Sequence, residues 1–300
     1  MKKGIILFFI ALMPLAADAQ RIKERWKSYR TELHFGIGAS NFLGELGGAN
    51  QVGTDYFKDL EMSTTRPAVS FGLRYKLLQW FAVNPQFTYG QVSGRDALTE
   101  EAFRNYRNLN FKSNIYELAV NFEGHFLREQ MGSRYRLRGV KGARGFEISA
   151  YGFVGIGAFY FNPKGSFEGE WHELQPLGTE GQGLTASRDP YKRVQVVIPF
   201  GIGFKYNFSR DLGIGLQYGI RKTFTDYIDD VSKTYYDNAI ILTERGDIAS
   251  ALADKSDGTF PNITAAGQQR GDPNDKDAYM FAVISINYKL RTGRSNFPIF

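Results

Sequence analysis

Eight segments of the chain place apolar or aromatic residues at every second position, with polar or small residues between them. That period is typical of β-strands with one apolar face. In one segment, Val69, Phe71 and Leu73 alternate with Ser70 and Gly72. The predicted strands are 31–40, 67–77, 81–90, 113–127, 146–161, 193–208, 212–224 and 279–291. The fifth segment is apolar on both faces, so its register stays open and a bulge is one option.

Each predicted strand is near or above the ~9–11 residues that a tilted strand needs to cross a bilayer. After residue 20, no stretch offers the ~18 consecutive apolar residues of a spanning helix. A closed barrel is the other architecture that satisfies every backbone group in lipid. The pattern therefore predicts an all-β fold, an eight-stranded antiparallel transmembrane β-barrel with long extracellular loops.

The composition, with 33 glycines and 15% aromatic residues, also suits a secreted β-sandwich. Two bands of aromatic residues at the predicted strand ends favour the barrel, because membrane barrels carry a girdle at each interface. The predicted inner band contains Tyr75, Trp80, Phe126, Phe146, Tyr206, Phe208 and Tyr288. The predicted outer band contains Tyr89, Tyr160, Phe224 and Tyr279.

The connections alternate in length. Tight turns follow the second and sixth strands, whereas the long links are 41–66, 91–112, 162–192 and 225–278. Short periplasmic turns and long external loops are typical of outer-membrane barrels, so both chain ends are expected in the periplasm. The link 128–145 breaks this pattern, because it is long where a periplasmic turn is expected.

The start of the chain predicts export. Lys2 and Lys3 precede an apolar run at 5–15, and Ala17-Asp18-Ala19 is a small-x-small cleavage pattern. We expect a signal peptide at 1–19, a basic periplasmic leader at 20–30, the barrel at 31–291 and a periplasmic C-terminal tail at 292–300. Ile22, Trp26 and Tyr29 recur at helical spacing, so the leader is either a short amphipathic helix or disordered.

Polar residues on the inward faces predict the content of the lumen. They are Arg74, Lys76, Asn84, Gln86, Glu117, Asn121, Glu123, Lys205, Gln217 and Arg221. Eight strands enclose only enough room for side chains. We therefore favour a salt-bridged plug, with a narrow ion path as the alternative.

The sequence predicts no catalytic, cofactor-binding or metal-binding residues. It has no cysteine, which excludes disulfides, thiolate chemistry and an acylated lipoprotein anchor. The histidines His34, His125 and His172 have no metal-ligand spacing. The pair Asp229-Asp230 could bind calcium or act as acid and base, but a solvated turn is the preferred interpretation.

Basic residues concentrate on the predicted periplasmic side, and acidic residues in the 225–278 loop. A basic surface there could dock an acidic partner or anionic headgroups, although retained positive charge is the simpler alternative. The predicted partner-binding residues are Arg128, Arg134, Arg136, Arg138, Lys141 and Arg144.

Four ordered motifs resemble one family of barrels. They are Phe42-Leu43-Gly44-Glu45-Leu46-Gly47-Gly48, Arg66-Pro67-Ala68-Val69, Arg107-Asn108-Leu109-Asn110-Phe111-Lys112-Ser113 and Thr225-Asp226-Tyr227-Ile228-Asp229-Asp230-Val231-Ser232. They are similar to the PorG-like outer-membrane barrels of Bacteroidetes, which include a type IX secretion system component and its paralogues. The resemblance marks Asp226, Tyr227, Asp229 and Asp230 as family-motif loop residues.

That resemblance implies a non-enzymatic barrel that anchors a periplasmic ring of lipoprotein and soluble protein. The expected partners are outer-membrane lipid and these ring proteins, with no cofactor and no nucleic acid. Three alternatives stay open: a small channel, an outer-membrane enzyme, and a surface receptor that uses the acidic 225–278 loop.

Overall fold

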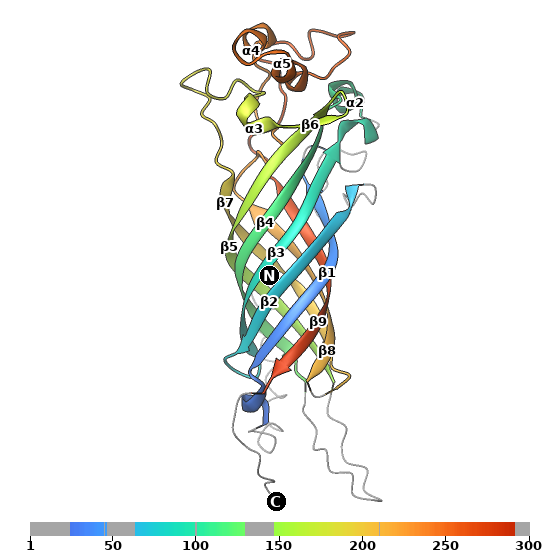
Figure 1. Cartoon of the computed structure of the whole chain (residues 1–300), viewed down its shortest axis with the longest axis vertical. Helices are drawn as coiled ribbons and strands as arrows, with labels where there is room; N and C mark the ends of the chain where they lie inside the picture. Colours follow the sequence, from blue (N-terminus) through green and yellow to red (C-terminus); the bar gives the residue numbers. More distant parts are fainter. Residues whose placement is uncertain are drawn as a thin grey trace, which may run out of the picture.

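The computed structural model describes residues 25–44, 46, 64–99, 101–129, 147–209 and 211–291, which form one closed β-barrel (Figure 1). Eight long antiparallel strands make its wall, and the short β6 (Glu170–Glu173) pairs with the end of β5. The wall strands are β1 (Thr31–Leu43), β2 (Arg66–Lys76), β3 (Phe81–Arg95), β4 (Asn110–Leu127), β5 (Ile148–Phe167), β7 (Val194–Tyr206), β8 (Leu212–Thr223) and β9 (Ala278–Leu290). The predicted fold class is confirmed.

The first and last strands close the barrel. β1 pairs with β9 in continuous antiparallel register from Thr31↔Leu290 to Leu43↔Ala278. The other neighbours follow chain order, including the β4–β5 pair. Closure gives every wall strand a partner on both sides, which satisfies the backbone without an exposed sheet edge.

The predicted alternation sets the two faces of the wall. In β1, Phe35 and Ile37 are exposed on the outside, whereas Glu32 and His34 are buried in the lumen. All the inward polar residues predicted from the sequence are buried. Because the outer face is apolar and the inner face polar, the wall is inside out relative to a water-soluble protein.

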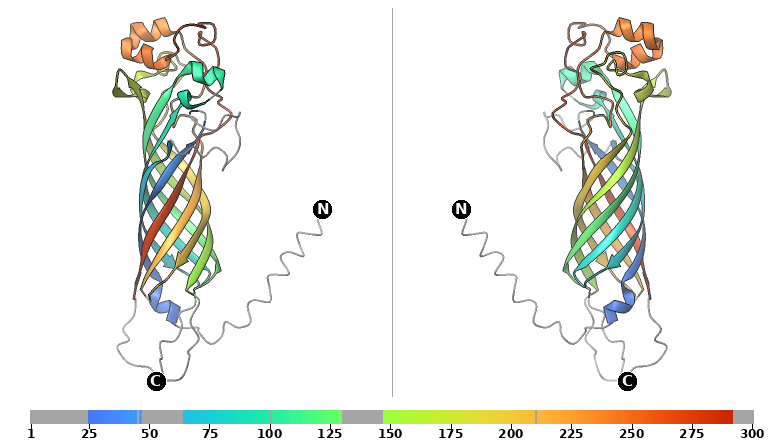
Figure 2. Two further views of the ribbon diagram at one scale, coloured as in Figure 1. Left: turned by 90° about the vertical axis from the view of Figure 1, so that its right-hand side faces the viewer. Right: turned by 90° about the vertical axis from the view of Figure 1, so that its left-hand side faces the viewer.

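The two ends of the barrel differ. The turn end holds the tight β2–β3 and β7–β8 connections, the start of β1 and the end of β9, with the 3₁₀ helix η2 (Arg25–Tyr29) beneath it (Figure 2). The loop end carries the helices that follow the strands (Figure 1). They are η5 (Asp96–Leu98), α2 (Ala102–Arg107), α3 (Leu174–Leu177), α4 (Asn238–Arg245) and α5 (Asp247–Ala253). None of the helices in the described ranges is long and apolar enough to cross a bilayer.

The register of the fifth strand, left open by the sequence, is settled by aromatic packing. Phe153 and Phe159 are buried inside the barrel, and Val154 and Ile156 are exposed outside. The lumen therefore takes large apolar side chains from β5 alongside polar ones from its neighbours. The irregularity in this pair lies opposite, where the β4 register shifts between His125 and Leu127.

Three expectations need correction or limitation. Tyr279, predicted in the outer aromatic band, is fully buried, because the alternation of β9 turns it inward with Phe281. The leader forms a short 3₁₀ helix over Arg25–Tyr29, where Arg30 stacks on Trp26 at 4.9 Å. Phe146, the 1–19 segment, most of the 128–145 link and the 292–300 tail lie outside the described residues.

A glycine in β7 provides the first test of this packing. The ring of Tyr151 covers Gly203, and a Cβ at this position would overlap the ring at Cζ. Gly203→Ala should destabilise the barrel by about 1–3 kcal/mol through overpacking. The matched control is Gly124→Ala, whose Cβ would meet only Gly152 O at 4.0 Å. Thermal unfolding followed by heat-dependent gel mobility measures both, and equal midpoints would contradict the prediction.

Candidate functional site

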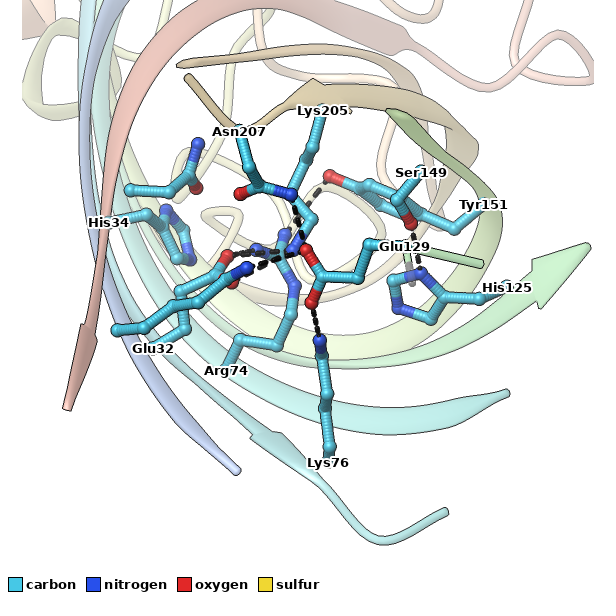
Figure 3. A network of polar contacts seen from close by, with 12 residues as sticks. Glu32, His34, Arg74, Lys76, His125, Glu129, Ser149, Tyr151, Lys205 and Asn207 are labelled. Carbon is cyan, nitrogen blue, oxygen red and sulfur yellow. Dashed lines mark hydrogen bonds and ion pairs between the residues drawn. The ribbon is translucent and has the colours of Figure 1, made fainter. Parts of the chain in front are cut away.

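The lumen near the turn end is filled by paired charges (Figure 3). Arg74 from β2 is buried between two carboxylates, donating from Nε to Glu123 Oε2 at 2.5 Å and from Nη1 to Glu32. Lys205 from β7 reaches the same Glu32 at 2.8 Å. Arg74 Nη2 also donates to Tyr151 OH at 3.0 Å. Charges in a small lumen are stabilised when they are paired in this way, so the predicted pairing of opposite charges in the lumen is confirmed.

Glu129 forms the floor of this network, that is, its last carboxylate at the turn end, although it belongs to the link after β4. Its carboxylate accepts from Lys289 Nζ at 2.6 Å and also pairs with Lys76 and Asn207. Figure 3 shows Glu129 projecting to the middle of the lumen opening. Without Glu129, the ammonium groups of Lys76 and Lys289 would lose the carboxylate that balances them.

Asn207 ties both ends of that link to the barrel. Its side chain donates to Glu129 at the start of the link, and its backbone N donates to Glu147 O at 2.9 Å at the other end. The link that holds the predicted partner-binding residues is therefore clamped to the residue that follows β7. Among those residues only Arg128 is described, and it flanks Glu129; the others, which lie outside the described residues, are Arg134, Arg136, Arg138, Lys141 and Arg144.

The histidines of the strands have structural roles in the lumen wall. His34 Nε2 lies 2.9 Å from Asn84 Oδ1, and His125 Nδ1 lies 2.9 Å from Ser149 Oγ. The two histidines are linked through Glu123, which lies 3.3 Å from His125 Nε2 and accepts from Asn84, the partner of His34. Within the described ranges, no three His, Asp or Glu side chains form a group that could hold a metal ion.

Aromatic side chains close the lumen towards the loop end. Glu117 pairs with Arg221 at 3.3 Å and accepts from Tyr279 OH at 2.8 Å. This bond stabilises the inward position that the alternation of β9 gives to Tyr279. Above it, Phe159 stacks between Tyr279 and Phe161, with centroid distances of 5.4 and 5.5 Å. A buried apolar layer therefore separates the lumen charges from the loops.

Above this layer, buried polar residues lock the long loops together. We call Asp96, Arg107, Glu180, Asp229, Asp230 and Arg270 the cap lock; all are buried. Arg107 binds Asp96 through Nε at 2.7 Å and through Nη2 at 2.9 Å, and its Nη1 donates to Arg270 O at 2.5 Å. Arg270 in turn pairs with Glu180 at 3.1 Å. Three loops are thereby joined through one chain of contacts.

The family-motif loop supplies the centre of the cap lock. Asp230, at a positive φ of 68°, accepts from Tyr191 OH at 2.7 Å and from Thr179. Asp229 accepts from Leu46 N at 3.3 Å, which adds the first loop. The preferred interpretation of Asp229-Asp230 as a solvated turn is wrong, because loops far apart in sequence cover both carboxylates.

The other two family-motif residues belong to the same buried region. Tyr227 stacks on Tyr191 with ring centroids 4.7 Å apart. Asp226, which precedes it, is also buried. All four motif residues that the resemblance marks therefore take part in the packing of the loop end.

Some residues of these networks were missed from the sequence. Glu129 carries a partial signal, since it continues the inward alternation of Glu117 and Glu123 beyond the apparent strand end. Nothing local marks Glu180 or Arg270, because each sits in a polar loop and is buried only by other loops.

The floor can be tested at Glu129. Glu129→Gln removes the charge that balances Lys76 and Lys289, and breaking a buried pair costs about 3–5 kcal/mol. We expect a lower unfolding midpoint and faster hydrogen exchange at the turn end. Glu147→Gln, which changes an exposed carboxylate at the other end of the same link, is the matched control. If the two variants have the same unfolding midpoint, Glu129 does not stabilise the charge network at the turn end.

The cap lock predicts a pH dependence. Burial raises the pKa of Asp230 to about 6, against opposing contributions from Arg270, Thr179 and Tyr191. Because the pKa of Asp230 is higher in the folded state than the unfolded value of 3.8, protonation of Asp230 stabilises the packed loops of the cap lock. This stabilisation is fully present below pH 3.8 and is lost as the pH rises through about 6.

Hydrogen exchange of the 228–235 amides, corrected for intrinsic rates, should therefore show easier cap opening at pH 7 than at pH 5. Asp230→Asn should remove this difference, whereas the exposed control Asp275→Asn should keep it. The assignment fails if wild type and Asp230→Asn respond identically to pH.

The chain is similar in fold to other solved barrels at low sequence identity. Ail, the attachment invasion locus protein of Yersinia pestis, is 11% identical with a TM-score of 0.38, over 87% of this chain and 99% of that chain. Neisserial surface protein A is 7% identical with a TM-score of 0.37, over 86% and 96%. A major outer membrane protein from Thermus thermophilus is 9% identical with a TM-score of 0.35, over 86% and 99%. The comparison with curated proteins found no match.

The family assignment comes from the sequence. Residues 6–243 match the family described as the outer membrane protein beta-barrel domain, which covers most of the chain. The closed wall, its apolar outer face and its paired lumen agree with that match. The chain therefore belongs to the outer membrane protein β-barrel family and is an outer-membrane protein.

Proposed function

We propose that this barrel is a non-enzymatic anchor that holds a periplasmic protein assembly against the outer membrane. The observation that carries the proposal is the clamp at the turn end, where Asn207 binds both Glu129 and Glu147. Both ends of the link are held at the turn end, which supports a docking role for the basic residues that the sequence places between them.

The charge of the link suits an acidic partner. Residues 128–145 contain six basic residues, which are Arg128, Arg134, Arg136, Arg138, Lys141 and Arg144. The one acidic residue of this range, Glu129, is occupied by Lys76 and Lys289 in the lumen. The link therefore offers positive charge without a carboxylate of its own to neutralise it, which favours association with an acidic surface.

The resemblance to PorG-like barrels supplies the identity that we propose for the partner. It is the periplasmic ring of lipoprotein and soluble protein of a type IX secretion system. The packed lumen supports anchoring over conduction, because paired charges and the aromatic layer fill the path between the two ends. We expect no ion current from the purified barrel in a planar bilayer.

A second candidate, a surface receptor, is favoured by the cap. Apolar side chains of α4 and α5 pack against Leu177 and Leu184 at the loop end. On these two helices Ile240, Leu242 and Ile248 are exposed. An ordered surface with exposed apolar side chains is suited to binding another protein. This candidate uses the opposite end of the barrel, so one experiment can separate the two.

The test is a pull-down of the tagged barrel from native outer membranes in mild detergent, followed by mass spectrometry. Arg134→Gln, Arg136→Gln and Arg138→Gln together should reduce recovery of the ring proteins about tenfold or more, because they remove charge from the docking surface. The control changes three exposed lysines of the loop end, Lys192→Gln, Lys233→Gln and Lys276→Gln.

Recovery of the ring proteins by wild type and control, with loss in the arginine variant, would support the anchor. Equal recovery by all three would remove the link as the docking site. Recovery of the barrel alone from wild type, with secretion intact in a deletion strain, would contradict the anchor and leave the loop end as the binding surface.

A further inference from the structure

On the outer face of β3, β4 and β5, three successive cross-strand rows at the loop end carry aromatic, then amide, then basic side chains. The first, the tyrosine row, aligns Tyr89, Tyr116 and Tyr160. The next, the amide row, aligns Gln91, Asn114 and Asn162. The last, the lysine row, pairs Lys112 with Lys164. Each row lies one pleat further from the middle of the barrel than the row before it.

The tyrosine row marks the level of the membrane surface. On its barrel side the outward positions are apolar, as in the row of Phe87, Leu118 and Ala158. Tyrosine at the edge of such a surface is typical of the interface between lipid tails and headgroups. The amide and lysine rows therefore lie at the headgroup level of the outer leaflet.

All the residues of these rows except Tyr89 line a hollow of about 430 Å³, which is within the size range of small-ligand sites. β6 folds back beside β5 near the top of the barrel (Figure 1) and supplies Trp171 to its wall. Lys112 Nζ lies 3.9 Å from the centre of the Trp171 ring. The hollow thus combines aromatic faces, side-chain amides and ammonium groups.

The charges of the hollow are incompletely balanced. Lys112 and Lys164 are direct cross-strand partners on one face, and like charges so placed repel. Lys164 lies 3.7 Å from Glu173, but that carboxylate also pairs with Arg193 at 3.1 Å. No carboxylate in the described part of the chain forms an ion pair with Lys112. An anion between the two lysines would relieve their repulsion.

We propose that this hollow binds the phosphorylated sugar headgroup of an outer-leaflet glycolipid. The phosphate lies between Lys112 and Lys164, because ammonium groups are strong phosphate donors. The sugar lies against Trp171 and the amide row, which offers both donors and acceptors. Its acyl chains run down past the tyrosine row along Phe87 and Leu118. The continuous path from the lysines to the lipid-facing wall favours a lipid over a soluble phosphosugar.

The experiment is native mass spectrometry of the full barrel, titrated in detergent with bisphosphorylated lipid A or with the same lipid lacking its phosphates. Wild type should retain the phosphorylated lipid at least about tenfold more tightly. Lys112→Gln with Lys164→Gln should lose that preference. The control is Lys222→Gln with Lys233→Gln, which makes the same change of charge away from the hollow and should keep the preference.

Heat-dependent gel mobility verifies that each variant is folded, and Trp171→Phe, which keeps an aromatic face, should retain most of the affinity. Equal binding of the phosphorylated lipid by wild type and the double lysine variant would overturn the site. Equal binding of a soluble bisphosphorylated disaccharide without acyl chains would overturn the lipid assignment.

Discussion

Backbone amides and carbonyls find no water inside a bilayer, so each must bond within the protein. The β1–β9 pairing meets this requirement by joining the first strand to the last. Closure also fixes which side chains face lipid and which face the lumen, since a shift of one residue would exchange the faces. The apolar outer surface, the paired lumen and the arrangement of the loops all depend on that register.

The small lumen then determines how charge is arranged. Arg74 and Lys205 are stable inside the wall because Glu32 and Glu123 lie within reach of them. The last charge at the turn end is balanced by Glu129, which is not part of a strand. The same contact that completes the lumen therefore fixes the start of the basic link, and this connects the packing of the barrel with its proposed role as an anchor.

The loop end is built on a different principle. Its loops are joined by the cap lock, in which the buried groups of Glu180 and Arg270 come from different loops and pair with each other. The motifs that carry the family resemblance meet here: Phe42 packs on Phe111 at 4.8 Å, Arg107 binds Asp96, and Asp230 binds Tyr191. These motif residues hold the loops of this end together, which is a structural role.

The sequence by itself determined the eight strands and the faces of most of their residues, because a period of two is local and the two environments differ sharply. The faces of the fifth strand and of Tyr279 were decided by the structure. It also marked Asp229 and Asp230 as a motif, but it could not show that they are buried. That result depends on Leu46, Thr179 and Tyr191, which come from two other loops. Likewise, only the register between strands aligns Lys112 with Lys164 or brings Glu129 to Lys289. Alternation along one strand depends only on neighbouring residues, whereas contacts between distant segments depend on how the closed barrel packs.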